Sequence, residues 1–140
     1  MLPHETPLID RYVAWLETLA PQGVHRVAQF VARDVRYRTP EREGAGVDAA
    51  IVIHAALFDG VSALRMKVTD RASGLNGHTA YLRWDRLVTR ADGVKYSLSG
   101  VSEAMIDMTG KIASIVEYWD GVPPPPAPRG LLARLLKRQG

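Results

Sequence analysis

Glu117 stands out as a candidate for proton transfer, because it is a carboxylate inside an apolar and aromatic stretch near the end of the chain. The stretch Lys111–Asp120 is typical of a strand, in which alternate residues share a face. Ile115, Glu117 and Trp119 therefore lie together. If this face lines a pocket, desolvation by such neighbours favours the protonated carboxyl and suits it to proton transfer. The alternative is a glutamate paired with an arginine such as Arg83.

His54 is a second candidate. It shares a helical face with Ala50 and Leu57, and this face is expected to look inward. An imidazole has an unperturbed pKa near neutrality, so it can act as a general base. The alternative is a semi-buried histidine with one hydrogen bond. His25 and His78 are interpreted as solvent-facing.

Several other kinds of chemistry find no support. The chain has no cysteine, which excludes disulfides, zinc–thiolate sites and thiol catalysis. No histidines or carboxylates stand at a convincing metal-ligand spacing, so we expect neither a metal nor a cofactor. The segment Gly44–Gly46 lacks the lysine and the helix start of a phosphate-binding loop. No serine–histidine–acid arrangement is suggested.

The elements that must position these residues form two groups. Apolar periodicity predicts helices at 7–20, 24–33 and 48–58, and a short strand at 34–39 ended by Pro40, with a loop at 41–46. After Ser62 the pattern changes to period two and predicts four long antiparallel strands, the last three at 79–89, 96–107 and 111–120. Helices followed by antiparallel strands predict an α+β domain. In strand 79–89, either the face with Arg83 and Asp85 or the face with Leu82, Trp84 and Arg86 looks into the pocket.

The overall composition predicts a single soluble domain. The chain has 140 residues, 46% of them hydrophobic and 24% charged, as in ordinary globular proteins. No apolar run approaches the ~18 residues of a membrane helix. The first residues lack the features of a signal peptide, so a cytoplasmic location is expected. The net charge is +3, but the basic residues of the last twelve positions contribute +4 and leave the body at −1. We therefore expect no nucleic-acid partner.

The C-terminal segment is predicted to lie outside the domain. The domain is expected to span residues 1–121, and a tail to span 122–140. Prolines at 123–126 form a stiff spacer, and residues 130–138 read as a short basic amphipathic helix. This helix either covers the sheet or a partner subunit, or makes peripheral contact with an anionic membrane. It is too short to bind a bilayer firmly by itself.

The order of elements resembles the nuclear transport factor 2-like fold, and more narrowly its SnoaL-like and ketosteroid-isomerase-like branch. The resemblance spans roughly residues 7–120. Four stretches carry it: Arg11–Leu16, Asp34–Pro40, Tyr81–Asp85 and Val116–Asp120. The resemblance implies an α+β cone, with three N-terminal helices packed on a strongly bent antiparallel sheet and a pocket at the open end. It also places Trp119 and Glu117 on the pocket side.

Specific roles follow from the resemblance. Tyr12 matches the oxyanion-donating tyrosine of ketosteroid isomerases, and His54 falls where a supporting pocket tyrosine is common, so that it could orient Tyr12. Glu117 matches the acidic position that serves as general acid or base in the cyclase branch. Thr39 replaces the catalytic aspartate of the isomerases, and a threonine hydroxyl cannot abstract a proton from carbon at neutral pH. Ser102 replaces the second oxyanion donor, a protonated aspartate.

The resemblance leads to two functional hypotheses. The first is a pocket for a small, mostly apolar, carbonyl-bearing molecule, with cofactor-free isomerisation, cyclisation or dehydration by Glu117 or His54, and with Tyr12 and Ser102 as hydrogen-bond donors. Its wall is formed by Trp119, Tyr37 and Phe58. The second is a non-catalytic ligand-binding or dimerisation module, which the altered positions 39 and 102 favour. Both include a homodimer formed through the outer face of the sheet.

Overall fold

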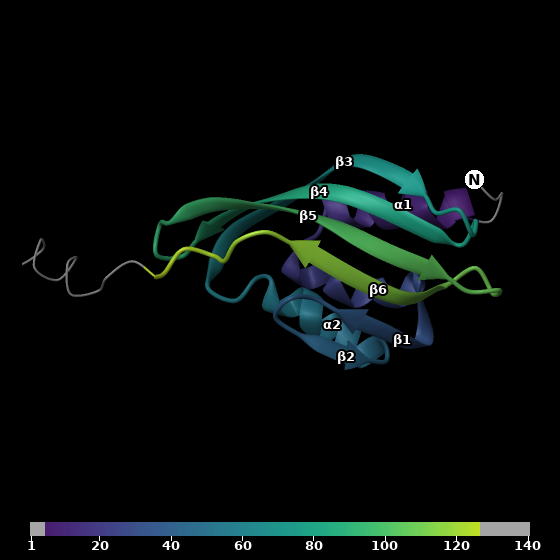
Figure 1. The fold of residues 1–140 in the computed structure, drawn as a ribbon. Coiled ribbons are helices and arrows are strands. Elements are labelled where there is room, and N and C mark those ends of the chain that lie inside the picture. Colours follow the sequence, from purple (N-terminus) through teal and green to yellow (C-terminus); the bar gives the residue numbers. More distant parts are fainter. Residues whose placement is uncertain (1–4, 127–140) are drawn as a thin grey trace, which may run out of the picture.

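A computed structural model describes residues 5–126 of the chain. It contains helices packed on one sheet (Figure 1). In chain order the elements are α1 (Glu5–Glu17), the 3-10 helix η1 (Pro21–Gln29), β1 (Val31–Arg38), β2 (Glu43–Ala45), α2 (Val47–Ala56), β3 (Val61–Ser73), β4 (Thr79–Arg90), β5 (Lys95–Ile106) and β6 (Ile112–Trp119). The α+β class expected from the sequence is confirmed.

The sheet has six strands in the order β2-β1-β6-β5-β4-β3. The long strands β3 to β6 curve over α1, while α2 and the β1–β2 hairpin lie at the other side (Figure 1). Strand β1 pairs with β6 in parallel, and the remaining pairs are antiparallel. The expectation of a wholly antiparallel sheet is therefore wrong at this one pair. Bulges in the β3–β4 pairing add local bend and twist to the sheet.

The segment predicted as a second α-helix is a 3-10 helix. Its buried residues Val24 and Val27, together with Phe30 at its C-terminal cap, recur every third position, which matches the three residues per turn of a 3-10 helix. Gly23 and the β-branched valines also lower α-helix propensity. The chain then enters β1 at Val31, three residues earlier than expected. The predicted loop at 41–46 contains the short strand β2, which pairs with β1.

Strand β4 turns its tryptophan inward. Leu82 and Trp84 are completely buried and Arg86 is 5% exposed, so this set faces the interior and Arg83 lies on the outer face. Gly100 lies opposite Trp84 on β5, and a Cβ atom there would lie 2.6 Å from the Trp84 ring. Glycine at position 100 therefore leaves the space that the indole occupies.

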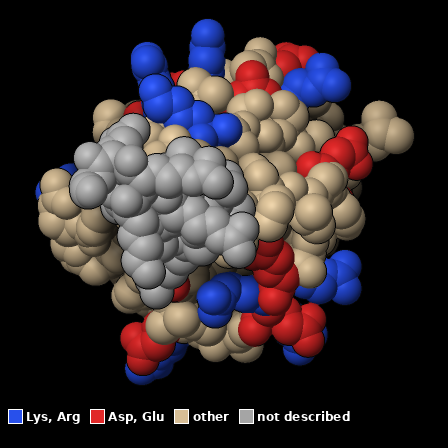
Figure 2. Space-filling model, turned by 90° about the vertical axis from the view of Figure 1, so that its left-hand side faces the viewer, with Lys and Arg blue, Asp and Glu red and all other residues tan. Residues whose placement is uncertain are grey.

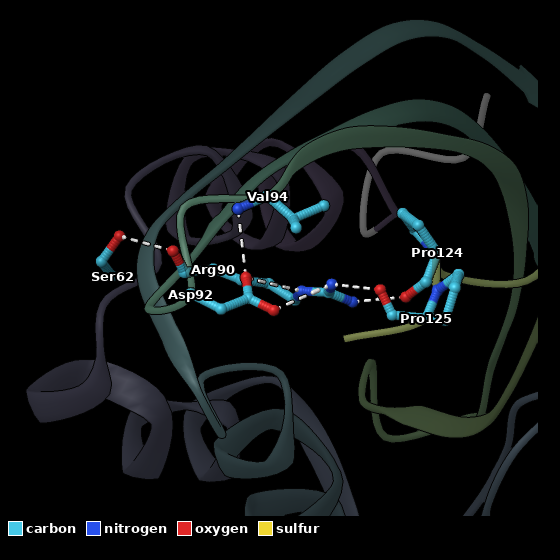
Figure 3. Close-up of polar contacts among 6 residues, drawn as sticks. All are labelled: Ser62, Arg90, Asp92, Val94, Pro124 and Pro125. Carbon is cyan, nitrogen blue, oxygen red and sulfur yellow. Dashed lines mark hydrogen bonds and ion pairs between the residues drawn. The ribbon is translucent and has the colours of Figure 1, made fainter. Parts of the chain in front are cut away.

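Hydrogen bonds from strand β4 hold the proline segment beside the sheet. The Arg90 guanidinium donates hydrogen bonds to the carbonyl oxygens of Pro124 and Pro125, and it forms an ion pair with Asp92 at 3.1 Å (Figure 3). The predicted helix at 130–138 lies outside the described residues, and so does the membrane contact proposed for it. No helix within residues 5–126 is long and apolar enough to span a membrane.

Charges of both signs surround the end of the molecule from which the proline segment leaves. In the part of this face that Figure 2 draws in colour, basic and acidic side chains are interspersed, and neither sign forms a continuous patch. This view therefore offers no single-sign surface within the described part of the chain.

Candidate acid–base site

Glu117 points into the interior from β6 and is 8% exposed. The Ser102 hydroxyl donates a hydrogen bond to Glu117 Oε2 at 3.0 Å, and Trp84 Nε1 donates to Ser102 Oγ at 2.9 Å. An indole N–H can only donate, so Ser102 accepts from Trp84 and its own hydrogen is directed to Glu117. The three side chains form one buried chain of hydrogen bonds that ends on a carboxylate.

The pairing of the strands explains this chain. Ser102 on β5 lies opposite Glu117 on β6, so both side chains emerge from the same face at adjacent positions. No ion pair joins Glu117 to any described residue. The alternative pairing with Arg83 is wrong, because Arg83 is exposed on the outer face.

His54 is held on both ring nitrogens. It is 1% exposed, with Nδ1 2.8 Å from the Ala50 carbonyl oxygen and Nε2 3.3 Å from the Tyr37 hydroxyl. A carbonyl oxygen can only accept, so we assign the hydrogen to Nδ1, and Nε2 then accepts from Tyr37. Desolvation lowers the pKa of His54, and the hydrogen bond to Ala50 offsets part of this effect. The imidazole is therefore neutral at neutral pH.

Two buried tyrosines lie beside these groups. Burial and, to a smaller extent, the negative charge of Glu117 raise the pKa of Tyr12. The same two causes, in the same order, raise the pKa of Tyr37 well above its usual value. Both phenols therefore remain protonated. Although the Tyr37 hydroxyl is near enough to influence Tyr12, the Tyr12 hydroxyl has no hydrogen-bond partner among the described residues. It is a buried donor beside Tyr37 that does not line the cavity described below.

A cavity of about 60 Å³ adjoins Glu117 and His54. Its lining residues are Tyr37, Thr39, Glu41, Arg42, Ile53, His54, Ala56, Leu57, Glu117 and Trp119. This space is large enough for a few water molecules. It is far below the ~300 Å³ at which pockets for drug-sized ligands begin. A larger ligand therefore requires side chains at the rim to move, and Trp119, which is only half-buried, is one of them.

The predicted site residues are only partly brought together. Thr39 lines the cavity, but its oxygen accepts from the backbone N–H groups of Glu41 and Arg42 at 3.2 and 3.0 Å. Ser102 is completely buried and donates to Glu117, so its hydrogen is not available to a ligand. Phe58 packs against the core and does not line the cavity. Tyr12 lies outside the lining as well.

Two residues near the site could not be assigned from the sequence. Trp84 anchors the hydrogen-bond chain, and the Arg86 guanidinium lies 4.7 Å from the Trp84 ring and 5.1 Å from the Trp119 ring. The period-two pattern grouped Trp84 with Arg86 but left the direction of this face open. The inward direction of Trp119 does not by itself determine which face of β4 is buried. The register of β4 and β6 with β5 is needed as well.

Metal-ligand clusters are not a feature of this region. Within residues 5–126, no three histidine, aspartate or glutamate side chains lie close enough to hold a metal ion together.

Comparisons with known proteins agree with this architecture. A model of the SnoaL-like domain matches residues 12–115. A protein of unknown function from Exiguobacterium sp. 255-15, described as nuclear transport factor 2-like, superposes with a TM-score of 0.70 at 18% identity, covering 82% of this chain and 99% of that one. A protein from Jannaschia sp. CCS1, described as a SnoaL-like polyketide cyclase, gives 0.71 at 14% identity, covering 96% and 93%.

A structure of TerC co-crystallised with polyporic acid gives a TM-score of 0.69 at 16% identity, covering 84% of this chain and 92% of that one. A comparison with characterised proteins at the sequence level found no match. Structural likeness at these identities shows the fold alone. The family model, in contrast, covers most of the chain, so this protein belongs to the SnoaL-like family, and its fold is the nuclear transport factor 2-like fold.

Proposed function

We propose that this protein binds a small, mostly apolar, carbonyl-bearing molecule and transfers a proton to or from it without a cofactor. The observation that carries the proposal is the position of Glu117. Its carboxylate is almost fully buried, has no ion-pair partner among the described residues and lines the cavity beside His54 and Tyr37. Buried carboxylates of this kind are frequent at sites of acid–base chemistry.

Glu117 removes a proton from the carbon next to the ligand carbonyl, and the electrons of the broken C–H bond move toward the carbonyl oxygen. In this scheme the donor to that oxygen is the Tyr12 hydroxyl, which is buried and protonated and has no hydrogen-bond partner of good geometry among the described residues. Because Tyr12 does not line the cavity, the ligand reaches it only when side chains of the lining move. Ser102 holds Glu117 in place. Return of the proton to another carbon gives isomerisation, while attack on a second carbonyl or loss of a hydroxyl gives cyclisation or dehydration.

His54 has a positioning role in this scheme. Its Nε2 already accepts from Tyr37 and its Nδ1 faces Ala50, so neither nitrogen is free to take a proton from a ligand. Its contact with Tyr37 fixes the phenol at the wall of the cavity.

Hydrogen exchange at carbon tests the proposal without knowledge of the natural substrate. Small ketones such as cyclohexanone are incubated with the full chain in D₂O, and deuterium at the α-carbon is followed by NMR. We expect exchange above the buffer rate, and a reduction of about a hundredfold or more in Glu117→Gln, the range of one general base. Glu103→Gln is the control, because Glu103 follows Ser102 on β5 and faces outward. Equal exchange in wild type and Glu117→Gln would refute the role of Glu117.

A second candidate function is a non-catalytic binding module. The observation in its favour is the small cavity of about 60 Å³ together with the engaged hydroxyls of Thr39 and Ser102. In that case ketones bind, but no α-hydrogen exchange above the buffer rate is seen in the wild type.

We also propose a homodimer through the outer face of the sheet. Several large apolar side chains are exposed on this face: Tyr118 at 52%, Leu87 at 49%, Met105 at 43% and Tyr81 at 37%. Exposed apolar side chains on one sheet face are a common property of contact surfaces between subunits. The cytoplasmic location expected from the sequence remains a proposal.

A further inference from the structure

Two arginines on the inner face of β4 differ sharply in their partners. Arg90 pairs with Asp92 and donates to two proline carbonyl oxygens (Figure 3). Arg86, four residues earlier on the same face, forms no ion pair and no hydrogen bond with any described residue. Its Nε is buried without a partner, and the whole residue is 5% exposed.

An unpaired charge in such a position is unfavourable for folding. Transfer of a guanidinium from water to the interior loses its hydration, and this loss is normally compensated by a carboxylate or by several hydrogen bonds. The rings of Trp84 and Trp119, at 4.7 and 5.1 Å, provide a partial compensation through cation–π attraction. A contact with a ring face uses none of the five N–H donors of the guanidinium. These donors therefore have no acceptor within the described protein, and the Nε–H among them is also fully buried.

Glu117 does not provide the missing acceptor, although it lies on the same inner face. Strand register places Glu117 beside Ser102 in one row and Trp119 beside Gly100 and Trp84 in the next. The Arg86 guanidinium contacts this row of tryptophans. Rows on one face of a strand are separated by ~7 Å, two residues of ~3.4 Å each. The interior thus holds a carboxylate and a guanidinium separated by indole rings.

We propose that Arg86 is the counter-ion for a carboxylate on the ligand, so that the site takes small apolar carboxylic acids. This inference rests on the proposed function, which it deepens by naming the class of ligand. A guanidinium presents N–H groups in a planar fork that matches both oxygens of a carboxylate. Because Trp119 both lines the cavity and contacts Arg86, a ligand that displaces this indole reaches both groups. Its carboxylate then lies on Arg86 and its reacting carbon toward Glu117.

The test compares matched charged and neutral probes on the full chain. Benzoate and benzamide, and cyclohexanecarboxylate and cyclohexanecarboxamide, are titrated by calorimetry at pH 7 and constant ionic strength. We expect each carboxylate to bind about ten- to a hundredfold more tightly than its amide, the range for hydrogen bonds to a charged group. Arg86→Met removes this preference, and Arg86→Lys, which keeps the charge without the fork, retains only part of it. Arg83→Met, on the outer face of the same strand, behaves as the wild type.

The proposal is overturned if the wild type binds each amide as well as its carboxylate, if the preference persists in Arg86→Met, or if none of the four probes binds. Thermal unfolding of Arg86→Met provides an independent measurement. Loss of an uncompensated charge leaves the Tm unchanged or raises it, whereas a purely structural arginine gives a lower Tm with no change in ligand preference. If Arg86→Met does not fold, Arg86→Lys still decides the comparison. Ketone exchange that depends on Glu117 but shows no role for Arg86 would leave the proposed function standing.

Discussion

The hydrogen-bond chain from Trp84 through Ser102 to Glu117 makes a quantitative prediction about stability. In Ser102→Ala, the buried Trp84 N–H loses its acceptor at 2.9 Å and Glu117 loses a donor at 3.0 Å. An unsatisfied buried donor costs about 1–3 kcal/mol, and a hydrogen bond to a charged group contributes about 1.5–3 kcal/mol. Since Ser102 is completely buried, solvent cannot replace either bond. We expect a loss of about 2–5 kcal/mol in the free energy of unfolding.

A double-mutant cycle separates the two contributions. Trp84→Phe removes the indole N–H, so Ser102→Ala made in that background no longer leaves an unsatisfied donor. The serine substitution should then cost about 1–3 kcal/mol less than in the wild type. Urea unfolding at pH 7 measures all four proteins, and the remaining tryptophans, Trp15 and Trp119, report the transition. Trp84→Phe also removes packing contacts of the indole. This loss is present in the single variant Trp84→Phe and in the double variant, so it cancels from the cost of Ser102→Ala in that background.

The matched control is Ser99→Ala. Ser99 donates to Asp85 at 2.7 Å on the exposed outer face, so its replacement should change the free energy of unfolding by about 0.5 kcal/mol or less. The hydrogen-bond chain would be refuted if Ser102→Ala and Trp84→Phe were additive to within about 0.5 kcal/mol, the normal limit for independent sites. A cost for Ser102→Ala as small as that of Ser99→Ala would refute it as well.

Two further predictions concern pH and assembly. Because the folded protein holds His54 with a lowered pKa, the unfolded chain binds more protons below the usual value of 6.5, so His54 contributes a loss of stability as the pH falls through and below that value. As the pH is lowered from 7.5 to 5, the urea midpoint should therefore fall less steeply in His54→Gln than in the wild type. If the two curves of midpoint against pH are parallel, the lowered pKa of His54 is contradicted. If the outer face forms the dimer, Tyr118→Glu should convert a dimer to a monomer in light scattering. Arg26→Glu, at an exposed position of η1 away from this face, should not. A wild-type monomer would exclude this interface at the concentration tested.

The pattern of alternate residues was sufficient to place part of the site. Ile115, Glu117 and Trp119 were predicted to share a face, and burial confirms that Glu117 and Ile115 look inward. The α+β class and the approximate positions of the long strands were also predictable, because alternation is a local property of each strand. The resemblance to the family added the direction of that face, which the alternation did not contain.

Other features depend on contacts between distant parts of the chain. The parallel pairing of β1 with β6 joins residues near position 36 to residues near 114, and no local pattern encodes it. The state of Ser102 is a second example. Its residue type suggested a donor for a ligand, but the register with Trp84 and Glu117 commits both its acceptor and its hydrogen. A hydroxyl can serve either role, so only its neighbours decide which one it takes.

Arg86 shows the division most clearly. The sequence determined that Leu82, Trp84 and Arg86 share one side of a strand, and that Arg83 and Asp85 share the other. Either set could face inward, because an isolated strand has two equivalent sides. In the tertiary structure the Trp84 face is the buried one, and Gly100 on the neighbouring strand leaves space for the Trp84 ring. Because alternate residues of a strand share a face, burial of the Trp84 indole also buries Arg86. The Arg86 guanidinium then has no ion-pair partner among the described residues.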